Sequence, residues 1–528
     1  VSGCQARRSD ATATVTCRQV VSMLAAVKSA ALMGIEAYDI IVEVDAAAGL
    51  PQWTMVGLPL GAVKESRERV GAALVNSGFK MPPRRITVNL DPADVRKEGT
   101  AFDLPIAIGI LVATGQLDPL VIKGRLFVGE LGLDGTIRGI RGALSIARRA
   151  EACKSIDELV LPLANLAEAG RVSSLRLSAQ SDFRALADEL RCGTLSISVA
   201  RPQVAAPSTD SLDFADVVGQ QSAKRALEVA AAGGHNVMMI GPPGAGKTML
   251  ARRLPGILPE LSEAESLEVI AIHSVAGTLT SQALASGARP FRSPHHSISS
   301  AGLIGGGGTP RPGEVSLAHN GVLFLDEMLE FPRSVLEGLR QPMEDGKVVI
   351  SRATMSVPFP ARFTLVGATN PCPCGRLGDP TGKCTCSPSD VERYSSRLSG
   401  PLNDRIDMHV AVGAVPLSDL SSCASGESSS VVRTRVDAAR SRQASRFGRL
   451  RGIECNAHSP GRWIDSHGNI ETAARTLLQK AAGSLSLSAR GYHRVLKVAR
   501  TIADIDEDET VTERHVAEAL RYRPAGRT

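Results

Sequence analysis

The sequence has few aromatic residues and no long apolar run. Phenylalanine, tryptophan and tyrosine make up 3% of the 528 residues, which argues against a surface that binds nucleic acid mainly by stacking bases on aromatic rings. The longest apolar run, LPIAIGILVATG at residues 104–115, is shorter than the roughly 18 residues that indicate a membrane-spanning helix. We therefore expect no membrane partner and interpret this run as a buried helix.

The sequence also lacks a large excess of positive or negative charge. The 60 basic and 54 acidic residues give a formal net charge of +6, so any surface that attracts nucleic acid must be local rather than global. Apolar residues make up 43% and charged residues 22%, which is typical of globular proteins. A chain of this length is expected to fold as two or three domains.

The first residues resemble a signal peptide only superficially. An apolar stretch at 20–27 follows several arginines, but Lys28 ends it early and no convincing cleavage site follows. We interpret residues 1–22 as a disordered or mis-called extension and expect folded structure from Met23. We expect a cytoplasmic protein, whose cysteines stay reduced.

Residues 23–200 alternate β-rich and helical runs and predict an α/β domain. Strands are expected at 40–44, 53–57, 85–90, 126–131 and 158–162. A helix is expected at 63–77, with one apolar face formed by Val63, Val70, Leu74 and Val75. The next stretch, 201–211, contains proline and serine without periodicity and predicts a linker.

Residues 212–415 contain a phosphate-binding loop. The apolar run at 237–240 predicts a buried strand, and a helix is expected from Met249. Between them, GPPGAGKT fits the pattern G-x-x-x-x-G-K-[ST] in its strand-loop-helix context. Such a loop turns backbone N–H groups toward phosphate oxygens, its lysine faces the β- and γ-phosphates, and its threonine hydroxyl binds Mg²⁺. The predicted nucleotide-binding residues are Gly241, Pro242, Pro243, Gly244, Ala245, Gly246, Lys247 and Thr248.

Two further apolar strands end on polar residues. GVLFLDE at 321–327 supplies Asp326, expected to hold Mg²⁺ through water, and Glu327, expected to act as general base on the attacking water. FTLVGATN at 363–370 ends on Asn370. Because ligands bind at the carboxyl ends of parallel strands, we expect Asn370 to sense the γ-phosphate or the water. ATP and Mg²⁺ are the predicted cofactors.

The last region, residues 416–528, reads as a small helical lid. Ser430 is a candidate N-cap for a helix at 431–447. Arg490 lies in the first turn of a later helix, and Arg405 precedes an apolar strand. From the residues alone, each of these arginines could contact phosphate or be merely solvated.

Four of the ten cysteines lie in one short stretch, in the pattern C-x-C-x9-C-x-C. Four thiolates can hold a tetrahedral Zn²⁺, and alternate residues of an extended chain point to one side, so each pair can converge. Structural zinc is the favoured interpretation, with free thiols and disulfides as alternatives. Catalytic zinc is disfavoured because four thiolates leave no open position. The four residues are Cys372, Cys374, Cys384 and Cys386.

Taken in order, these motifs resemble an AAA+ ATPase. The longer stretches HNVMMIGPPGAGKTMLARRLPGILP, FRSPHHSIS, GEVSLAHNGVLFLDE, ATNPCPCG and SGPLNDRIDMHV are similar to the magnesium-chelatase-like ComM (YifB) family. The resemblance implies that Arg405 is an arginine finger and Arg490 a sensor-2 residue. It also implies a homohexameric ring motor that drives branch migration, with branched or single-stranded DNA as partner, during recombination of incoming DNA. A magnesium-chelatase-type ATPase subunit and an ATP-gated protein scaffold are the alternatives.

The same resemblance identifies two segments that face the pore in related motors. Residues 291–319 match a helix-2 insert containing His295 and His296, and residues 345–363 match a hairpin. Positive charge on mobile loops suits DNA tracking, but solvated charges on a hairpin explain the pattern equally well. The cations of the hairpin segment are Lys347, Arg352 and Arg362.

Residues 97–111 and 128–142 resemble the Lon-protease-like domain. Proteolysis of that type needs a serine nucleophile and a lysine that lowers the barrier to its deprotonation. Thr100, Ala101 and Phe102 stand near the serine position, and Ala143 and Leu144 near the lysine position. The resemblance therefore implies a domain without protease activity, which serves ring assembly or nucleic-acid contact.

Overall fold

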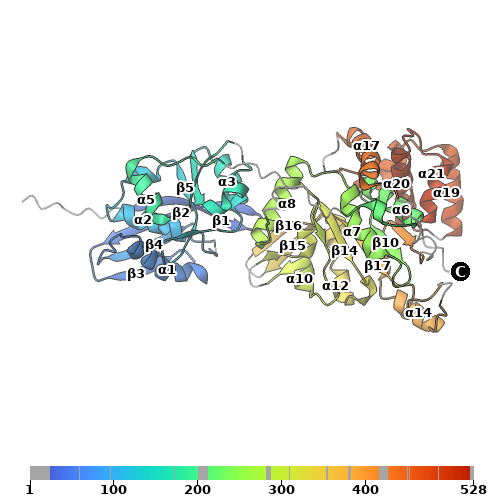
Figure 1. Ribbon diagram of the computed structural model, residues 1–528, viewed down its shortest axis with the longest axis horizontal. Coiled ribbons are helices and arrows are strands. Elements are labelled where there is room, and N and C mark those ends of the chain that lie inside the picture. The colour runs from blue at the N-terminus through green and yellow to red at the C-terminus, as the bar shows by residue number, and fades with distance from the viewer. Residues whose placement is uncertain are drawn as a thin grey trace, which may run out of the picture. The chain divides into compact units, whose positions relative to one another are not determined.

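The computed structural model of the chain describes residues 24–58, 60–95, 97–172, 174–199, 212–280, 287–307, 310–352, 355–378, 382–414, 426–448, 450, 452–485 and 487–523. The predicted extension 1–22 and linker 201–211 lie outside these residues. The described chain forms two compact units (Figure 1). The first comprises residues 24–31, 37–140 and 146–199, and the second contains residues 212–523. Within the described residues, no helix combines the length and apolar character needed to cross a membrane.

The first unit is built on a mixed seven-stranded sheet in the order β3-β4-β2-β1-β5-β8-β9. β2 and β4 pair antiparallel, whereas β3 with β4, and β1, β5, β8 and β9 in succession, pair parallel. The elements are β1 (Ala25–Met33), β2 (Glu36–Ala47), β3 (Gln52–Val56), α1 (Ala62–Asn76), β4 (Arg85–Asp91), α2 (Asp103–Ala113), β5 (Arg125–Phe127), β6 (Glu130–Leu131), β7 (Ile137–Arg138), α3 (Ala143–Ala152), β8 (Glu158–Pro162), α4 (Leu166–Ala169), β9 (Arg176–Gln180) and α5 (Phe183–Cys192).

All five strands predicted for this unit are present, although the run at 126–131 divides into β5 and β6. The apolar run at 104–115 forms the fully buried helix α2, as predicted. The predicted apolar face of α1 is correct for three residues and wrong for Val75, which is 57% exposed. Val75 lies about 100° around the helix axis from Leu74, and this rotation takes it off the buried face formed by Val63, Val70 and Leu74.

The second unit contains a sheet of five parallel strands in the order β11-β14-β17-β10-β18. Because the strands are parallel, their carboxyl ends lie along one edge, where ligands bind in sheets of this kind. The strands are β10 (Val237–Ile240), β11 (Phe291–Arg292), β14 (Gly321–Leu325), β17 (Phe363–Thr369) and β18 (Met408–Ala411).

Helices and two small hairpins surround this sheet (Figure 1). Antiparallel β15 and β16 form the hairpin expected within 345–363. The elements are α6 (Gln221–Gly233), α7 (Lys247–Ile257), α8 (Glu263–Ala276), α10 (Ser300–Ile304), β12 (Gly305–Gly306), β13 (Arg311–Pro312), α11 (Glu314–Leu317), α12 (Arg333–Glu337), α13 (Arg340–Asp345), β15 (Lys347–Arg352), β16 (Met355–Pro360), α14 (Pro388–Ser395) and α15 (Gly400–Asn403).

The carboxyl-terminal region is helical and shares one apolar cluster with the core. The Ser428 hydroxyl accepts a hydrogen bond from Val431 N and caps α17, so the predicted cap Ser430 is wrong by two residues. Val495, Val498, Ile502 and Ile505 form part of the buried face of α20. The helices are α17 (Ser429–Phe447), α18 (Gly461–His467), α19 (Thr472–Ser484), α20 (Ala489–Ile505) and α21 (Glu513–Arg521).

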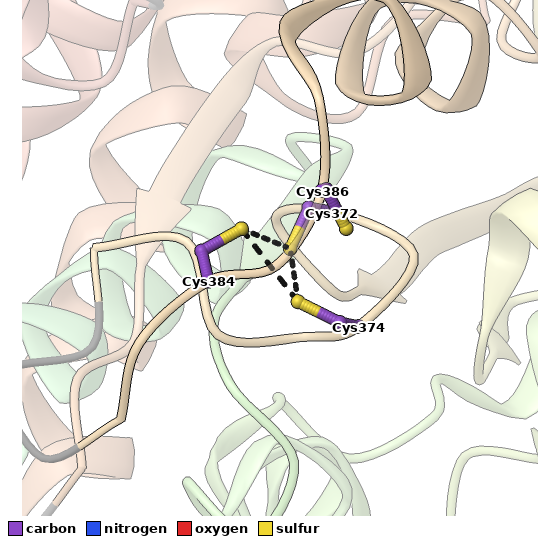
Figure 2. A group of neighbouring side chains, drawn as sticks. All are labelled: Cys372, Cys374, Cys384 and Cys386. Atoms are coloured by element: carbon purple, nitrogen blue, oxygen red, sulfur yellow. Dashed lines mark hydrogen bonds between the residues drawn. The ribbon is translucent and has the colours of Figure 1, made fainter.

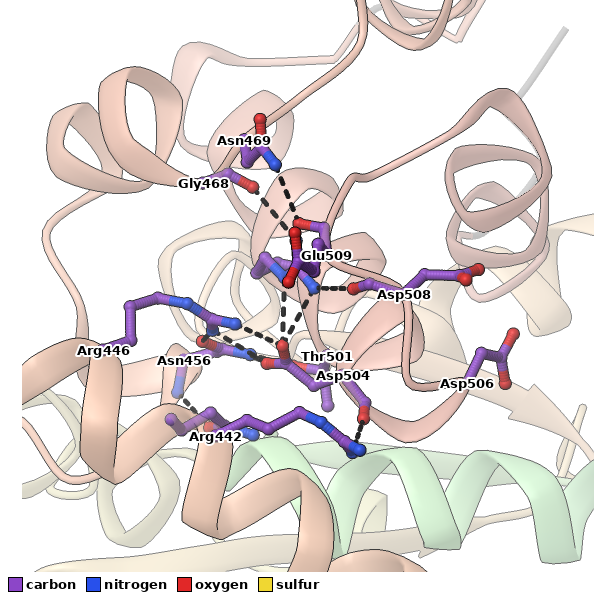
Figure 3. A network of polar contacts seen from close by, with 12 residues as sticks. Arg442, Arg446, Asn456, Gly468, Asn469, Thr501, Asp504, Asp506, Asp508 and Glu509 are labelled. Atoms are coloured by element: carbon purple, nitrogen blue, oxygen red, sulfur yellow. Dashed lines mark hydrogen bonds and ion pairs between the residues drawn. The ribbon is translucent and has the colours of Figure 1, made fainter.

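A buried polar network holds these helices together around Asp504 (Figure 3). Its carboxylate is fully buried and accepts hydrogen bonds from Arg446 Nη1 at 2.9 Å, Asn456 Nδ2 at 2.8 Å and Arg500 Nε at 3.1 Å. These partners come from α17, the turn before α18 and α20 itself. A buried charge is tolerated when it is paired and hydrogen-bonded in this way.

Candidate active site

The phosphate-binding loop follows β10 at the carboxyl edge of the sheet, and α7 begins at Lys247. Gly244 and Gly246 have φ angles of 78° and 87°, a region that favours glycine. A Cβ atom on either residue would meet no other atom within 4 Å. The loop is therefore open where phosphate groups would lie, and its residues fit a nucleotide.

Lys247 is buried and joins the loop to the end of β17. Its Nζ donates to the carbonyl oxygens of Gly241 and Pro242, at 2.7 and 2.9 Å, and to Asn370 Oδ1 at 3.2 Å. Burial lowers the pKa of the Lys247 ammonium, and the neighbouring carboxylates of Asp326 and Glu327 oppose that shift. The structure thus brings the predicted sensor residue into contact with the lysine of the loop.

Thr248 and Asp326 also meet. Thr248 Oγ1 donates to Asp326 Oδ2 at 2.7 Å. Neighbouring oxygen ligands of an octahedral Mg²⁺ lie about 3 Å apart, since each metal-oxygen distance is about 2.1 Å. The two residues fit a magnesium site, with the hydroxyl as direct ligand and the carboxylate acting directly or through water.

Glu327 stands just beyond this pair, with its side chain 57% exposed. Its φ angle of 48° is in the left-handed region, which is uncommon for a residue with a side chain and often marks a functional position. His296 Nδ1 lies 3.7 Å from Glu327 Oε2, and the His295 and His296 rings are 4.1 Å apart. The helix-2 insert, which the family resemblance places at the pore of related motors, therefore also contacts the candidate general base.

The two predicted arginines gather at a different place, around Glu344 at the end of α13. Arg405 Nη2 lies 2.6 Å from Glu344 Oε2, and Arg490 Nη2 lies 4.0 Å from Glu344 Oε1. The Arg405 side chain is only 13% exposed, and no described residue gives its Nε a hydrogen-bond partner. Sequence reasoning missed Glu344 because a single acidic residue at a helix end carries no motif.

Arg405 lies at the opposite edge of the sheet from the phosphate-binding loop. Its carbonyl accepts a hydrogen bond from Asn236 Nδ2 at 3.2 Å, and Asn236 precedes β10, whereas Gly241 follows it. The path along β10 between those residues is about 16 Å at about 3.3 Å per residue, farther than an arginine side chain extends. Arg405 therefore cannot complete the site of its own chain.

The hairpin offers less free positive charge than the sequence suggested. Lys347 is exposed, but Arg362 Nη1 pairs with Glu454 Oε1 at 2.7 Å. The side chain of Arg352 lies outside the part of the chain that the structure describes. Arg311, on the short strand β13 of the insert, is exposed.

The four cysteines of the predicted metal motif converge after β17 (Figure 2). Their sulfur atoms all lie within 4.8 Å of one another, and the four residues are free cysteines.

Three known protein families match successive parts of the chain. Residues 213–420 match the family described as magnesium chelatase, subunit ChlI; residues 42–165 match subunit ChlI of Mg-chelatase, and residues 426–523 match the ChlI C-terminal family. The chain is 44% identical over 508 residues to competence protein ComM of Haemophilus influenzae, covering 95% of this chain and 97% of that protein. The chain belongs to the ComM (YifB) family of magnesium-chelatase-like proteins.

Other relatives agree with this assignment. The uncharacterized protein YifB of Escherichia coli is 44% identical over 510 residues, 96% of this chain and 98% of that protein. Lon protease 2 of Bacillus subtilis is 31% identical over 186 residues, 30% of this chain and 33% of the protease. The predicted AAA+ and Lon-like α/β fold with a helical carboxyl-terminal region is confirmed. As a family member the chain is an AAA+ ATPase, which uses ATP and Mg²⁺.

Proposed function

We propose that this chain is a subunit of a hexameric ATP-driven ring motor that moves branched DNA during recombination of incoming DNA. The observation that carries the ring is the separation of Arg405 from the phosphate-binding loop across the length of β10. Arg490 lies beside Arg405 on Glu344. We assign both arginines to the nucleotide site of the neighbouring subunit.

The chemistry is transfer of a phosphoryl group to water. When bound, Mg²⁺ would neutralise part of the negative charge on the phosphate groups. Lys247 holds the β- and γ-phosphates, Asn370 orients the attacking water, and Glu327 accepts its proton. Arg405 of the next subunit stabilises the charge that develops in the transition state, so hydrolysis requires two adjacent copies.

DNA is the proposed partner for two reasons. The relative in Haemophilus influenzae carries the name competence protein, and the β15–β16 hairpin and the insert present exposed Lys347 and Arg311. His296 of the insert contacts Glu327, so movement of the insert can follow the state of the nucleotide site. This connection is what a DNA-tracking motor requires.

The decisive experiment measures ATP hydrolysis and strand movement with no DNA, single strands, forks and four-way junctions. We expect branched or single-stranded DNA to stimulate the wild type severalfold, and Glu327→Gln to bind nucleotide while hydrolysing it about a hundredfold more slowly or worse. Lys347→Ala should weaken the stimulation and leave basal turnover unchanged. Lys480→Ala, which removes an exposed lysine from α19, serves as the matched control.

If no DNA structure stimulates turnover and no strand is moved, the DNA proposal is wrong. An ATP-gated scaffold whose partner is a protein would then be favoured, and the AAA+ ATPase assignment would remain.

A further inference from the structure

The cysteine cluster has the geometry of a closed metal site. Cys372 Sγ lies 3.4 Å from Cys374 Sγ and 3.7 Å from Cys384 Sγ, and Cys374 Sγ lies 3.6 Å from Cys384 Sγ (Figure 2). Cys386 Sγ lies within 4.8 Å of each of the others. In a tetrahedral site with metal-sulfur bonds of about 2.3 Å, neighbouring sulfurs lie about 3.8 Å apart. These three sulfur-sulfur distances fall within a few tenths of an ångström of that value, and they are far longer than a disulfide bond.

The backbone around the cluster also suits a metal. The N–H groups of Arg376 and Thr385 donate to the sulfur of Cys374, the kind of outer contact that orients metal-binding thiolates. Gly375 N donates to the carbonyl oxygen of Cys372 at 2.9 Å and closes a tight turn that contains Cys374, and the φ angle of 77° at Gly375 favours glycine there. Without a cation, four clustered thiol groups would gain little stabilisation from one another, because S–H groups form only weak hydrogen bonds.

We propose that Cys372, Cys374, Cys384 and Cys386 bind one structural Zn²⁺ that fixes their loop against the phosphate-binding loop. Four soft thiolates in a tetrahedral arrangement favour zinc over the oxygen-preferring ions Mg²⁺ and Ca²⁺. All four ligand positions are filled by protein, so the ion has no open position for catalysis. This metal assignment does not depend on whether the protein moves DNA.

The position of the cysteine-containing loop indicates the structural role of the metal ion. Cys372 is buried two residues after Asn370, and a Cβ on Gly375 would lie 2.7 Å from Cδ of Pro243 in the phosphate-binding loop. The turn that carries the first cysteine pair thus packs on the phosphate-binding loop at Gly375. The second pair is followed by α14, α15 and then Arg405. The ion therefore holds together the residues that contact nucleotide and the segment that leads to the arginine finger.

Metal content of the full-length protein, purified without chelator, tests the site. We expect one zinc per chain, lost in the double variant Cys384→Ser, Cys386→Ser. The matched control Cys153→Ser, Cys192→Ser removes two cysteines from the first unit and should retain its zinc. Absence of metal, with no uptake of added Zn²⁺ under reducing conditions, would overturn the proposal. Iron in place of zinc would overturn the identity of the ion.

The second measurement separates a metal effect from misfolding. Zinc is removed from the wild type with a mercurial reagent and then restored after the thiols are regenerated, while circular dichroism monitors the fold. We expect a fluorescent ATP analogue to bind at least about fivefold more weakly without zinc, the lower range of coupling between two sites, and to regain its affinity with zinc. Unchanged affinity in a folded, zinc-free protein would show that the loop does not support the nucleotide site.

Discussion

Arg405 and Glu344 form an ion pair at 2.6 Å, and Arg490 lies 4.0 Å from the same carboxylate. One acidic residue at the end of α13 therefore gathers both predicted arginines at the edge of the sheet away from the phosphate-binding loop. The hairpin strand β15 begins three residues later, at Lys347. Glu344 thus links the arginines to the segment proposed to contact DNA.

Replacing Arg405 by alanine should leave nucleotide binding intact and lower ATP turnover about a thousandfold, the usual effect of losing an arginine finger. Mixing inactive Arg405→Ala with inactive Glu327→Gln should restore part of the activity. In a mixed ring, some interfaces combine an intact Glu327 with an intact Arg405 from the neighbouring subunit. Steady-state hydrolysis over a range of mixing ratios measures this effect.

Arg333→Ala, on α12 of the same unit, provides the control for loss of a positive charge. Turnover that stays at the level of the separate variants at every mixing ratio, although size analysis shows mixed oligomers, would mean that Arg405 does not act on the adjacent site.

Thr248→Ala should raise the Mg²⁺ concentration needed for half-maximal hydrolysis. The variant removes the hydroxyl that lies 2.7 Å from Asp326 Oδ2, so one proposed ligand is lost. Thr248→Ser keeps the hydroxyl and should behave like the wild type. A magnesium titration of ATP hydrolysis makes the comparison, and an identical magnesium requirement in the alanine variant would contradict the assigned role.

Asp504→Ala should destabilise the helical region by about 3–5 kcal/mol, because it leaves the buried guanidinium group of Arg500 and the partly buried one of Arg446 without their carboxylate. Denaturant unfolding followed by circular dichroism measures the change. Arg514→Ala breaks an exposed ion pair with Asp508 in the same region and should cost less than about 1 kcal/mol. Equal effects of the two substitutions would show that the network contributes no special stability.

The lowered pKa of the Asp407 carboxyl leads us to expect that the stability of the protein depends on pH. Burial alone would raise the pKa of its carboxyl, but His235 and Arg494 outweigh burial and hold that pKa well below its usual range. A lowered folded-state pKa stabilises the protein above the unfolded-state value of about 3.9, and this contribution is lost as pH falls toward the folded-state value. The difference in unfolding free energy between wild type and Asp407→Asn should therefore stay constant at higher pH and shrink progressively as the pH falls below about 5.

Urea unfolding at each pH measures that difference for both proteins. Comparing the two chains cancels the titration of groups that they share, and a difference that stays constant with pH would contradict the role given to Asp407.

The sequence predicts best where a local pattern decides the structure. The strand at 237–240, the loop after it and the strand before Asp326 are formed where expected, because buried apolar runs and glycine-rich turns are defined within a few residues. β1 and β9 were not predicted. Alanine, serine, lysine and glutamine favour strands only weakly, so pairing with neighbouring strands determines these two elements.

In the candidate site, too, some contacts follow from local motifs and others depend on tertiary packing. Thr248 follows β10 and Asp326 follows β14, and parallel strands bring the residues after them to the same edge of the sheet. The contact between these two residues could therefore be expected from their motifs. The meeting of Arg405 and Arg490 on Glu344, and of His296 with Glu327, depends on how distant segments pack. No local pattern encodes those pairs.

The pairing of Val237 with Met408 in the parallel sheet has a consequence for regulation. The pairing places Arg405 and the phosphate-binding loop at opposite ends of β10. If Arg405 acts on the neighbouring subunit, as we propose, a single molecule lacks a complete catalytic centre. The proposal then implies that ATP turnover per chain falls on dilution and rises again where the protein is concentrated.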